Sequence, residues 1–377
     1  MIKRIAIKHF KSIDSLELKL GPLTVVVGPN GSGKSNFVDA LRFVRDAAEG
    51  GLDSAISERH GIDSVRQWSP TRPYHVSFEI GLVATSGTGL LSFTLASARG
   101  QHRVYGETAT WVEWPKGSEE SQLPIFYARG EDVSLSPEGE AIASEAPEDE
   151  LALNEAPRFR EFRRLLRQIE TYSIFPNTLR TPQKPTNTTR LSSSGDNLTS
   201  VFKALTRSKS KRLVRRREEI VGALRKVMPN LDGIIIESPG GFMVPTFRVK
   251  EPNGKGHNFN VSQISDGTLR LFGLLTALYQ PDRPDVIAME EPEQTVNPGV
   301  LAVLADAIRE VSQSGTQIVI TTHSPHLVDL FEPEEILTAE LIDGRTVIRP
   351  INEAQKQAVK DRLFSLGELM TAEGLHG

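Results

Sequence analysis

A glycine-rich segment near the start of the chain has residue types and spacing suited to holding phosphate. It consists of Gly28, Pro29, Asn30, Gly31, Ser32, Gly33, Lys34 and Ser35. Without a Cβ, glycines let backbone N–H groups turn inward around the α- and β-phosphates, while Lys34 reaches the β- and γ-phosphates and the Ser35 hydroxyl ligates Mg²⁺. An incidental Gly/Ser turn is the alternative. The apolar strand expected before the segment and the helix expected after it favour a phosphate site, because the helix points its positive N-terminal end at the same anion.

Two neighbouring carboxylates end the apolar run of residues 286–289. At the tip of such a buried strand, Glu290 would hold Mg²⁺ through water, and Glu291 would polarise an attacking water as the general base. Paired acids at a strand end can also be merely solvated. Their position downstream of the glycine-rich segment favours the catalytic interpretation.

His323 follows another apolar run, residues 317–322, and precedes a helix that begins at Pro325. Ligands of α/β sheets bind at the carboxyl ends of the strands, so His323 is predicted to sense the γ-phosphate and to steady the catalytic water. Alternatively, His323 could cap a helix or could lie in the core with its hydrogen bonds satisfied.

The segment Ser265-Asp266-Gly267 begins the helix that precedes the paired glutamates. An ordinary helix start explains Ser265 as the N-cap and Asp266 in the first turn. It does not call for Gly267, which would permit the phosphate of another molecule to approach the helix N-terminus closely.

The elements that position these residues follow from hydrophobic periodicity. Residues 1–27 and 74–127 alternate apolar and polar residues as strands do, and residues 34–48 have a helical period. Helical stretches are predicted at 157–171, 196–207 and 210–228, after an acidic loop at 131–155. From residue 266 the chain alternates helix (266–280), strand (286–290), helix (298–313), strand (316–321) and helix (324–330), which indicates a parallel sheet.

The fold class is therefore predicted to be α/β, with a central, mainly parallel sheet, flanking antiparallel strands and a helical insertion. The predicted divisions are 1–150, which carries the glycine-rich segment, 151–230, which is the insertion, and 231–377, which carries the paired glutamates and His323. The 377 residues include no cysteine, which excludes disulfides and thiolate metal sites. No apolar run approaches the roughly 20 residues that span a bilayer, so a cytoplasmic protein without a membrane partner is expected.

The formal net charge is −4, so any surface for nucleic acid must be local. The basic residues of the insertion gather between 203 and 226, where Glu218 and Glu219 are the only acids. They are Lys203, Arg207, Lys209, Lys211, Arg212, Arg215, Arg216, Arg217, Arg225 and Lys226. They could contact the phosphates of DNA or RNA, or they could simply form a solvated helix face.

These motifs, in this order, resemble those of ABC-type ATPases of the SMC/RecF-like and OLD-like branch, and particularly its compact bacterial ATPases with an AAA domain. The resemblance runs from residue 1 to about 350. It rests on the segments at 7–12, 194–198, 265–270, 290–293 and 321–325, together with the glycine-rich Walker A segment.

The resemblance implies a P-loop NTPase that binds ATP with Mg²⁺ and forms a head-to-tail homodimer. In such a dimer, Ser265, Asp266 and Gly267 of one subunit close over ATP on the Walker A segment of the other. Gln67 is implied as a further Mg²⁺ ligand, although glutamine is also common on surfaces. Glu290 stands where many ABC proteins have aspartate, and Asn297 stands where a histidine is usual, which puts the contact between subunits in question.

Three functions are compatible with these features. The leading hypothesis is a nucleic-acid-linked ATPase for repair, recombination or anti-phage defence that works with a separate effector protein. A slowly hydrolysing, ATP-sensing scaffold for a partner protein is the second. The nucleotide-binding subunit of a transporter is disfavoured, because the signature is Ser-Asp-Gly and because a basic helical insertion has no role there.

Overall fold

The computed structural model describes residues 1–70, 74–98, 100–114, 125–130, 140–141, 146–251, 254–372 and 374–377. The chain forms two compact units, each built from separate segments. Unit 1 contains Met1–Glu170, Glu334–Glu353 and Leu375–Gly377, and unit 2 contains Thr171–Pro333 and Ala354–Gly374. Residues 131–139 and 142–145 of the predicted acidic loop lie outside the described residues. The division into 1–150, 151–230 and 231–377 stays a prediction.

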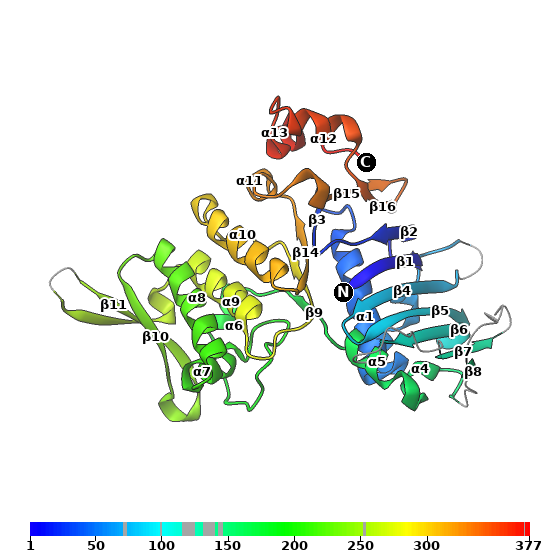
Figure 1. The fold of residues 1–377 in the computed structure, drawn as a ribbon, viewed down its shortest axis with the longest axis horizontal. Helices are drawn as coiled ribbons and strands as arrows, with labels where there is room; N and C mark the ends of the chain where they lie inside the picture. Colours follow the sequence, from blue (N-terminus) through cyan, green and yellow to red (C-terminus); the bar gives the residue numbers. More distant parts are fainter. Residues whose placement is uncertain are drawn as a thin grey trace. The chain divides into compact units, whose positions relative to one another are not determined.

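Unit 1 is built on a mixed sheet (Figure 1). In spatial order its strands are β8 (Glu140–Ala141), β7 (Ile125–Gly130), β6 (Gln101–Glu113), β5 (Gly87–Ala98), β4 (Val76–Ala84), β1 (Ile2–Phe10), β2 (Ile13–Lys19), β16 (Arg345–Pro350), β15 (Ile336–Ile342) and β3 (Leu23–Val27). The pairs from β7 to β2 are antiparallel, whereas β15 runs parallel to β3. The antiparallel strands predicted within residues 74–127 are thus confirmed for the described part of that range.

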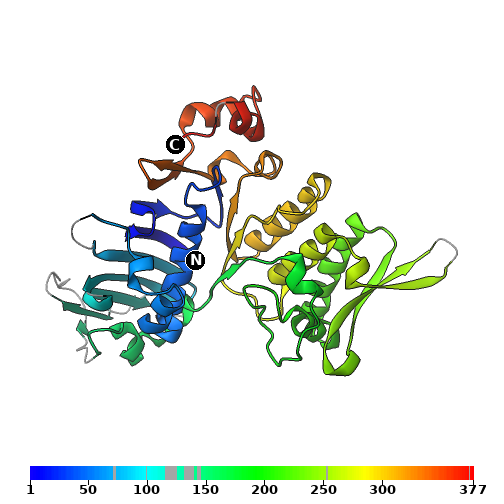
Figure 2. The same ribbon diagram turned by 180° about the vertical axis from the view of Figure 1, so that it is seen from behind.

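Helix α1 (Lys34–Gly50) lies against one face of this sheet, as Figures 1 and 2 both show. Alternate residues of β4 are buried, and Phe78 of this strand stacks on Phe43 of the helix with ring centroids 5.1 Å apart. The other helices of unit 1 are short. They are α2 (Leu52–Ser57), α3 (Ile62–Val65), α4 (Ala152–Glu155), a 3-10 turn (Pro157–Phe159) and α5 (Arg160–Leu166).

The helix predicted at 157–171 is wrong in its last residues. Helix α5 ends at Leu166, and Ile169–Tyr172 form strand β9. All four residues of β9 are buried, so the strand lacks the alternation that would have marked it.

Unit 2 is mostly helical. Its helices are α6 (Pro176–Arg180), α7 (Leu198–Arg207), α8 (Lys211–Val227), α9 (Asp266–Tyr279), α10 (Pro298–Gln313), α11 (Pro325–Val328), α12 (Glu353–Lys360) and α13 (Leu366–Ala372). Strands β13 (Val286–Glu290) and β14 (Gln317–Thr322) are parallel. Strands β10 (Leu231–Glu237), β11 (Val244–Lys250) and β12 (Gly256–Asn260) form a small antiparallel sheet.

Helix α9 is the centre of unit 2. It is buried from Leu269 to Tyr279, and the Phe272 ring meets the edges or faces of Phe202 and Phe247 at centroid distances of 5.0 and 5.6 Å. Such edge-to-face contacts add to the free energy gained by burial of apolar area. No helix in the described ranges is long and apolar enough to cross a membrane.

Candidate active site

The predicted phosphate loop connects β3 to α1 in unit 1. Gly31 and Gly33 adopt φ values of 82° and 91°, a region that residues with a Cβ rarely enter. Gly28 and Gly33 also pass close to the C-terminal strands. A Cβ added to Gly28 would lie 2.1 Å from the Ala339 carbonyl oxygen, and one added to Gly33 would lie 1.8 Å from Thr346 Oγ1. The glycine spacing is thus required by the path of the chain itself.

Lys34 lies along this loop. Its side chain is buried, and its Nζ donates hydrogen bonds to the carbonyl oxygens of Gly28 at 2.7 Å and Pro29 at 3.0 Å. Ser35 is exposed in the first turn of α1. Ser32 Oγ is buried and has no hydrogen-bond partner within the described ranges. A cation, an unpaired hydroxyl and a helix N-terminus at one loop fit the phosphates of a nucleotide and its Mg²⁺.

Three side chains that were not assigned to the site brace the loop. Thr346 Oγ1 donates to the Ser32 carbonyl at 3.0 Å and lies 2.6 Å from Ser12 Oγ, which accepts a hydrogen bond from Asn36 Nδ2 at 2.6 Å. The sequence contained no signal for Thr346, because it lies more than 300 positions from the loop it supports.

Gln67 follows the short helix α3 in unit 1. Its backbone N–H donates to the His9 carbonyl at 2.7 Å, which fixes the residue beside the end of β1. Its side-chain Oε1 is buried and accepts no hydrogen bond from any described residue. A buried amide oxygen without a donor suits a cation ligand, so this geometry is compatible with the predicted Mg²⁺ contact.

Glu291 and His323 lie together in unit 2. Strands β13 and β14 pair in parallel with Glu290 opposite Thr321, so both strands end at the same edge. The Glu291 N–H donates to the Thr321 carbonyl at 2.9 Å, and its carboxylate is hydrogen-bonded to His323 Nδ1. Glu291 has a φ of 46°, which is unusual for a residue with a long side chain. A carboxylate paired with an imidazole can accept and pass on a proton from water.

Glu293 is a buried acid beside this pair, and sequence reasoning gave it no role. Its Oε1 accepts hydrogen bonds from Thr322 Oγ1 at 2.6 Å and from the His323 N–H at 3.2 Å. Burial raises the pKa of Glu293, although these hydrogen bonds oppose the effect. One ligand atom each of Glu291, Glu293 and His323 lies within 4.8 Å of the others, so these residues could also hold a divalent ion. The sequence signals were its position two residues after Glu291 and its place in segment 290–293, which contributes to the resemblance.

The predicted signature residues begin α9, in the same unit. Ser265 is the N-cap, and its Oγ accepts a hydrogen bond from the Thr268 N–H at 3.2 Å. Asp266 pairs with Arg180 at 2.6 Å. A Cβ added to Gly267 would lie 2.7 Å from the Thr295 carbonyl oxygen, so packing within the same chain already favours glycine at this position. Its proposed approach to a second molecule's phosphate stays a prediction.

The predicted site residues therefore divide between the two units. The phosphate loop and Gln67 belong to unit 1, while Glu290, Glu291, His323 and the signature residues belong to unit 2. The pairing of Glu291 with His323 follows directly from the register of their strands.

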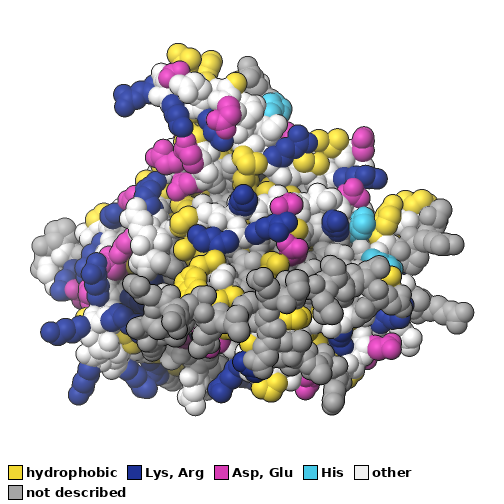
Figure 3. Space-filling view, turned by 45° about the vertical axis from the view of Figure 1, so that its right-hand side comes forward, with side chains coloured by type: hydrophobic (Ala, Val, Ile, Leu, Met, Phe, Trp, Pro, Cys, Tyr) yellow, Lys and Arg dark blue, Asp and Glu magenta, His cyan; other side chains and the backbone are white. Residues whose placement is uncertain are grey.

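The basic residues at 203–226 differ in what they contact. Arg216 donates to the carbonyl oxygens of Gln280 at 2.5 Å and Pro281 at 3.1 Å, and burial lowers its pKa to about 10. Arg225 donates to the Leu231 carbonyl at 2.9 Å. Exposed cations without a partner among the described residues are Arg207, Lys209, Lys211 and Arg212. Figure 3 shows acidic side chains interspersed among Lys and Arg on the face in view, in keeping with the net charge of −4.

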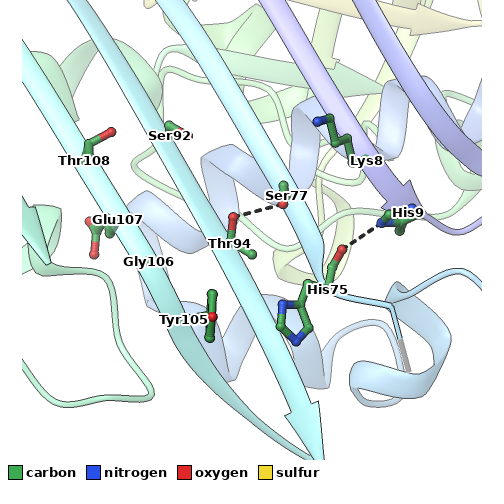
Figure 4. Close-up of a pocket in the computed structure, with 10 residues that line it drawn as sticks. All are labelled: Lys8, His9, His75, Ser77, Ser92, Thr94, Tyr105, Gly106, Glu107 and Thr108. Carbon is green, nitrogen blue, oxygen red and sulfur yellow. Dashed lines mark hydrogen bonds between the residues drawn. The ribbon is translucent and has the colours of Figure 1, made fainter. Parts of the chain in front are cut away.

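A separate polar pocket of about 490 Å³ lies on the sheet of unit 1, outside the predicted site residues. Figure 4 shows His9 beside His75, with His9 Nδ1 3.0 Å from the His75 carbonyl oxygen, and Ser77 hydrogen-bonded to Thr94 across β4 and β5 at 2.9 Å. These contacts tie neighbouring segments of the sheet together.

Comparisons with known proteins bear on the family and the fold of the chain. The family model described as "AAA domain, putative AbiEii toxin, Type IV TA system" matches residues 23–329. The chain is 46% identical over 44 residues to the OLD nuclease of Thermus scotoductus, which is 12% of this chain and 8% of that protein. It is 60% identical over 45 residues to the chromosome partition protein Smc of Desulfitobacterium hafniense, which is 11% of this chain and 4% of that protein. The matched segments thus span less than a tenth of these relatives.

Two solved structures share the fold over nearly their whole length. An Smc head bound to the C-winged helix domain of ScpA aligns with 94% of this chain and 99% of its own, with a TM-score of 0.58 at 17% identity. The Smc head domain with an extended coiled coil, bound to the C-terminal domain of ScpA derived from Pyrococcus furiosus, covers 96% and 99%, with a TM-score of 0.57 at 12% identity. These two structures confirm the predicted P-loop fold. The family model matches residues 23–329, which is most of the chain. The chain therefore belongs to the AAA-domain family described as putative AbiEii toxin of type IV toxin–antitoxin systems.

Proposed function

We propose that the protein binds MgATP at Gly28–Ser35 and hydrolyses it with Glu291 as the general base. The observation that carries the proposal is the hydrogen bond between Glu291 and His323 at the ends of two adjacent parallel strands. A phosphate loop alone would support nucleotide binding, whereas a carboxylate–imidazole pair adds a group that can take a proton from water. Membership of the AAA-domain family supports the same activity.

In the proposed reaction, Glu291 orients and deprotonates the attacking water, and His323 steadies Glu291 and contacts the γ-phosphate. Lys34 leaves its carbonyl partners to neutralise the β- and γ-phosphates. Ser35, Gln67 and Glu290 would hold Mg²⁺, which supplies charge neutralisation at the phosphates.

We further propose that hydrolysis occurs in a head-to-tail homodimer. Ser265, Asp266 and Gly267 form an exposed or half-exposed helix start that could close over the γ-phosphate of a second subunit. ATP would then favour the closed dimer because it contacts both subunits, and loss of the γ-phosphate would release it.

The work of the ATPase is proposed to concern nucleic acid, in repair, recombination or anti-phage defence, together with a separate effector protein. The exposed cations at 207–215 support this partner class. The ATP-sensing scaffold is a weaker candidate. Asn297, in place of the usual histidine, would favour slow hydrolysis and so this candidate. However, Asn297 is the N-cap of α10, where its Oδ1 accepts a hydrogen bond from the Gly299 N–H at 2.9 Å.

The test compares nucleotide binding with phosphate release in Lys34→Ala and Glu291→Gln. Lys34→Ala is expected to lose binding, and Glu291→Gln is expected to bind ATP but to hydrolyse it at least about 100-fold more slowly. Lys3→Ala, an exposed lysine on β1, is the control and should match the wild type. Hydrolysis by Glu291→Gln at the wild-type rate would disprove its role as the base. Adding DNA to the wild-type assay then tests the partner class, since stimulation is expected.

A further inference from the structure

Arg270, in α9, is a fully buried cation that the proposed reaction does not use. Its side chain is 0% exposed, and its Nη2 donates to the Glu291 carbonyl oxygen at 2.8 Å. Its guanidinium carbon lies 4.9 Å from the centroid of the Phe175 ring. Its Nε and Nη1 have no hydrogen-bond partner within the described residues. A buried charge with unsatisfied donors costs free energy, so its presence calls for a role beyond packing.

The carboxylate charges that act on this cation belong to the candidate site. Burial lowers the pKa of Arg270, and the charges of Glu293 and Glu291 oppose that change. Glu293 Oε2 is itself buried and lacks a hydrogen-bond partner in the described ranges. An incompletely paired cation, Arg270, and an incompletely paired acid, Glu293, thus both lie close to the proposed general base Glu291.

Helix α9 contacts the segment of residues 291–297 at two points. Arg270 holds the Glu291 carbonyl, and Gly267 packs against the Thr295 carbonyl, where an added Cβ would come within 2.7 Å. Glu291 and Thr295 both have positive φ, at 46° and 62°. Residues with side chains keep such conformations only where their surroundings hold them. The first turns of α9 provide part of that support.

We propose that Arg270 is a positioning residue that couples the N-terminus of α9 to the carboxylate of Glu291. When α9 shifts, the hydrogen bond from Arg270 moves the Glu291 carbonyl with it. The backbone of Glu291 then turns, and this changes the position of the Glu291 carboxylate relative to His323. Phosphate of a second subunit's nucleotide at Ser265–Gly267 would therefore align the base for hydrolysis. This inference rests on the proposed ATPase function.

The test uses Arg270→Met, Arg270→Lys and a matched control, Arg309→Met. Arg309 also donates to a main-chain carbonyl, that of Leu330 at 2.6 Å, but it lies on α10, and its hydrogen bond and its ion pair with Asp306 do not involve residues 291–297. Each variant is measured for nucleotide affinity, for kcat and for hydrogen–deuterium exchange of peptides covering residues 291–297. Arg270→Met is expected to lower kcat about 100-fold with affinity within threefold of wild type, and Arg270→Lys is expected to restore part of the loss.

Hydrogen–deuterium exchange distinguishes failure of the positioning role of Arg270 from failure of the proposed ATPase activity. If the wild type does not hydrolyse ATP, faster exchange at 291–297 in Arg270→Met but not in Arg309→Met still supports positioning by Arg270. The inference is overturned if Arg270→Met keeps the kcat of Arg309→Met, or if exchange at 291–297 is unchanged. It is also overturned if exchange rises equally throughout unit 2, since that would mean general destabilisation. Should Arg270→Met not fold, Arg270→Gln, which removes the charge but keeps a hydrogen-bond donor, replaces it in the same assays.

Discussion

At the scale of residues, several of the groups assigned to chemistry, and one residue near them, have unusual backbone conformations. Gly31, Gly33, Glu291 and Thr295 all have positive φ. For Glu291 and Thr295 the cost is on the order of 1–3 kcal/mol each, and hydrogen bonds and packing must offset it. The Glu291 N–H and carbonyl are both held, by Thr321 and by Arg270. The carboxylate is thereby presented to His323 instead of following the line of the strand.

The two glycines of the phosphate loop should respond differently to substitution. In Gly33→Ala the new Cβ would lie 1.8 Å from Thr346 Oγ1, whereas a Cβ at Gly31 would meet nothing within 4 Å. Both changes carry the strain of positive φ, about 1–2 kcal/mol, so Gly31→Ala should weaken nucleotide binding by about tenfold. Gly33→Ala adds a collision and should weaken binding at least about 100-fold. Titration with a fluorescent ATP analogue measures both, and equal losses would contradict the role given to Thr346.

Asp39 of α1 makes the stability of unit 1 depend on pH. Burial would raise its pKa, but the hydrogen bonds and charges of Arg59 and Lys11, at 2.8 and 2.7 Å, outweigh burial and lower it. A depressed carboxyl pKa stabilises the folded state above the unfolded pKa of about 3.9, and that stability is lost as pH falls through the folded value. Asp39→Asn should therefore cost about 2 kcal/mol at pH 7 and much less at pH 3.

Tryptophan fluorescence during urea unfolding is a suitable measurement, because Trp68, Trp111 and Trp114 all lie in unit 1. Asp63→Asn is the control. Asp63 pairs with Arg66 at 2.7 Å but its side chain is 66% exposed, so its loss should change little. A cost for Asp39→Asn that is the same at pH 3 and pH 7 would contradict the assigned ion pairs.

At the scale of elements, the sequence predicted best where an apolar run is bounded by clear start and stop signals. Helices α9 and α10 and strands β13 and β14 were predicted to within one residue at each end, because Ser265, Pro298 and the short connections mark them. Strand β9 was missed, since four consecutive buried residues continue a helical pattern equally well. The bracing of the phosphate loop by Thr346 was beyond prediction, because it depends on which strands become neighbours and not on local pattern.

Helix α8 combines structural and exposed cations, and substitutions should separate them. Changing Lys211, Arg212 and Arg215 to Glu should weaken DNA binding and flatten its dependence on salt, because all three are exposed and could contact phosphates. Arg216→Met should instead lower thermal stability, because Arg216 satisfies the carbonyls of Gln280 and Pro281. Salt-dependent binding measured by fluorescence anisotropy tests the first outcome. If the triple variant binds DNA with unaltered affinity, α8 is not part of a nucleic-acid-binding surface.

At the scale of the whole molecule, the assigned residues belong to two units, and the signature residues are proposed to act on a second subunit. This arrangement predicts complementation between inactive variants. Lys34→Ala lacks the cation of the phosphate loop, and Ser265→Arg places a bulky side chain at an exposed helix start. In a head-to-tail dimer, one of the two sites in a mixed pair would contain neither substitution.

Mixing the two variants in equal amounts should therefore restore about a quarter of wild-type ATPase sites, since half of the random pairs are mixed. The measurement is phosphate release by each variant alone and by the mixture. Light scattering of Glu291→Gln with MgATP, expected to show accumulated dimer, serves as an independent check. A mixture no more active than its components, together with a monomeric Glu291→Gln protein, would rule out the shared site.

The neighbours of Gly28 and Gly33 have a consequence for synthesis on the ribosome. Ala339 and Thr346 close one side of the phosphate loop, although the loop is translated some 300 residues earlier. A nascent chain that has not yet emerged beyond β16 has the glycine-rich segment but lacks the strands that hold it in shape. Newly made protein should consequently acquire affinity for nucleotide only after β16 has emerged, and chains terminated before β16 should not compete for ATP.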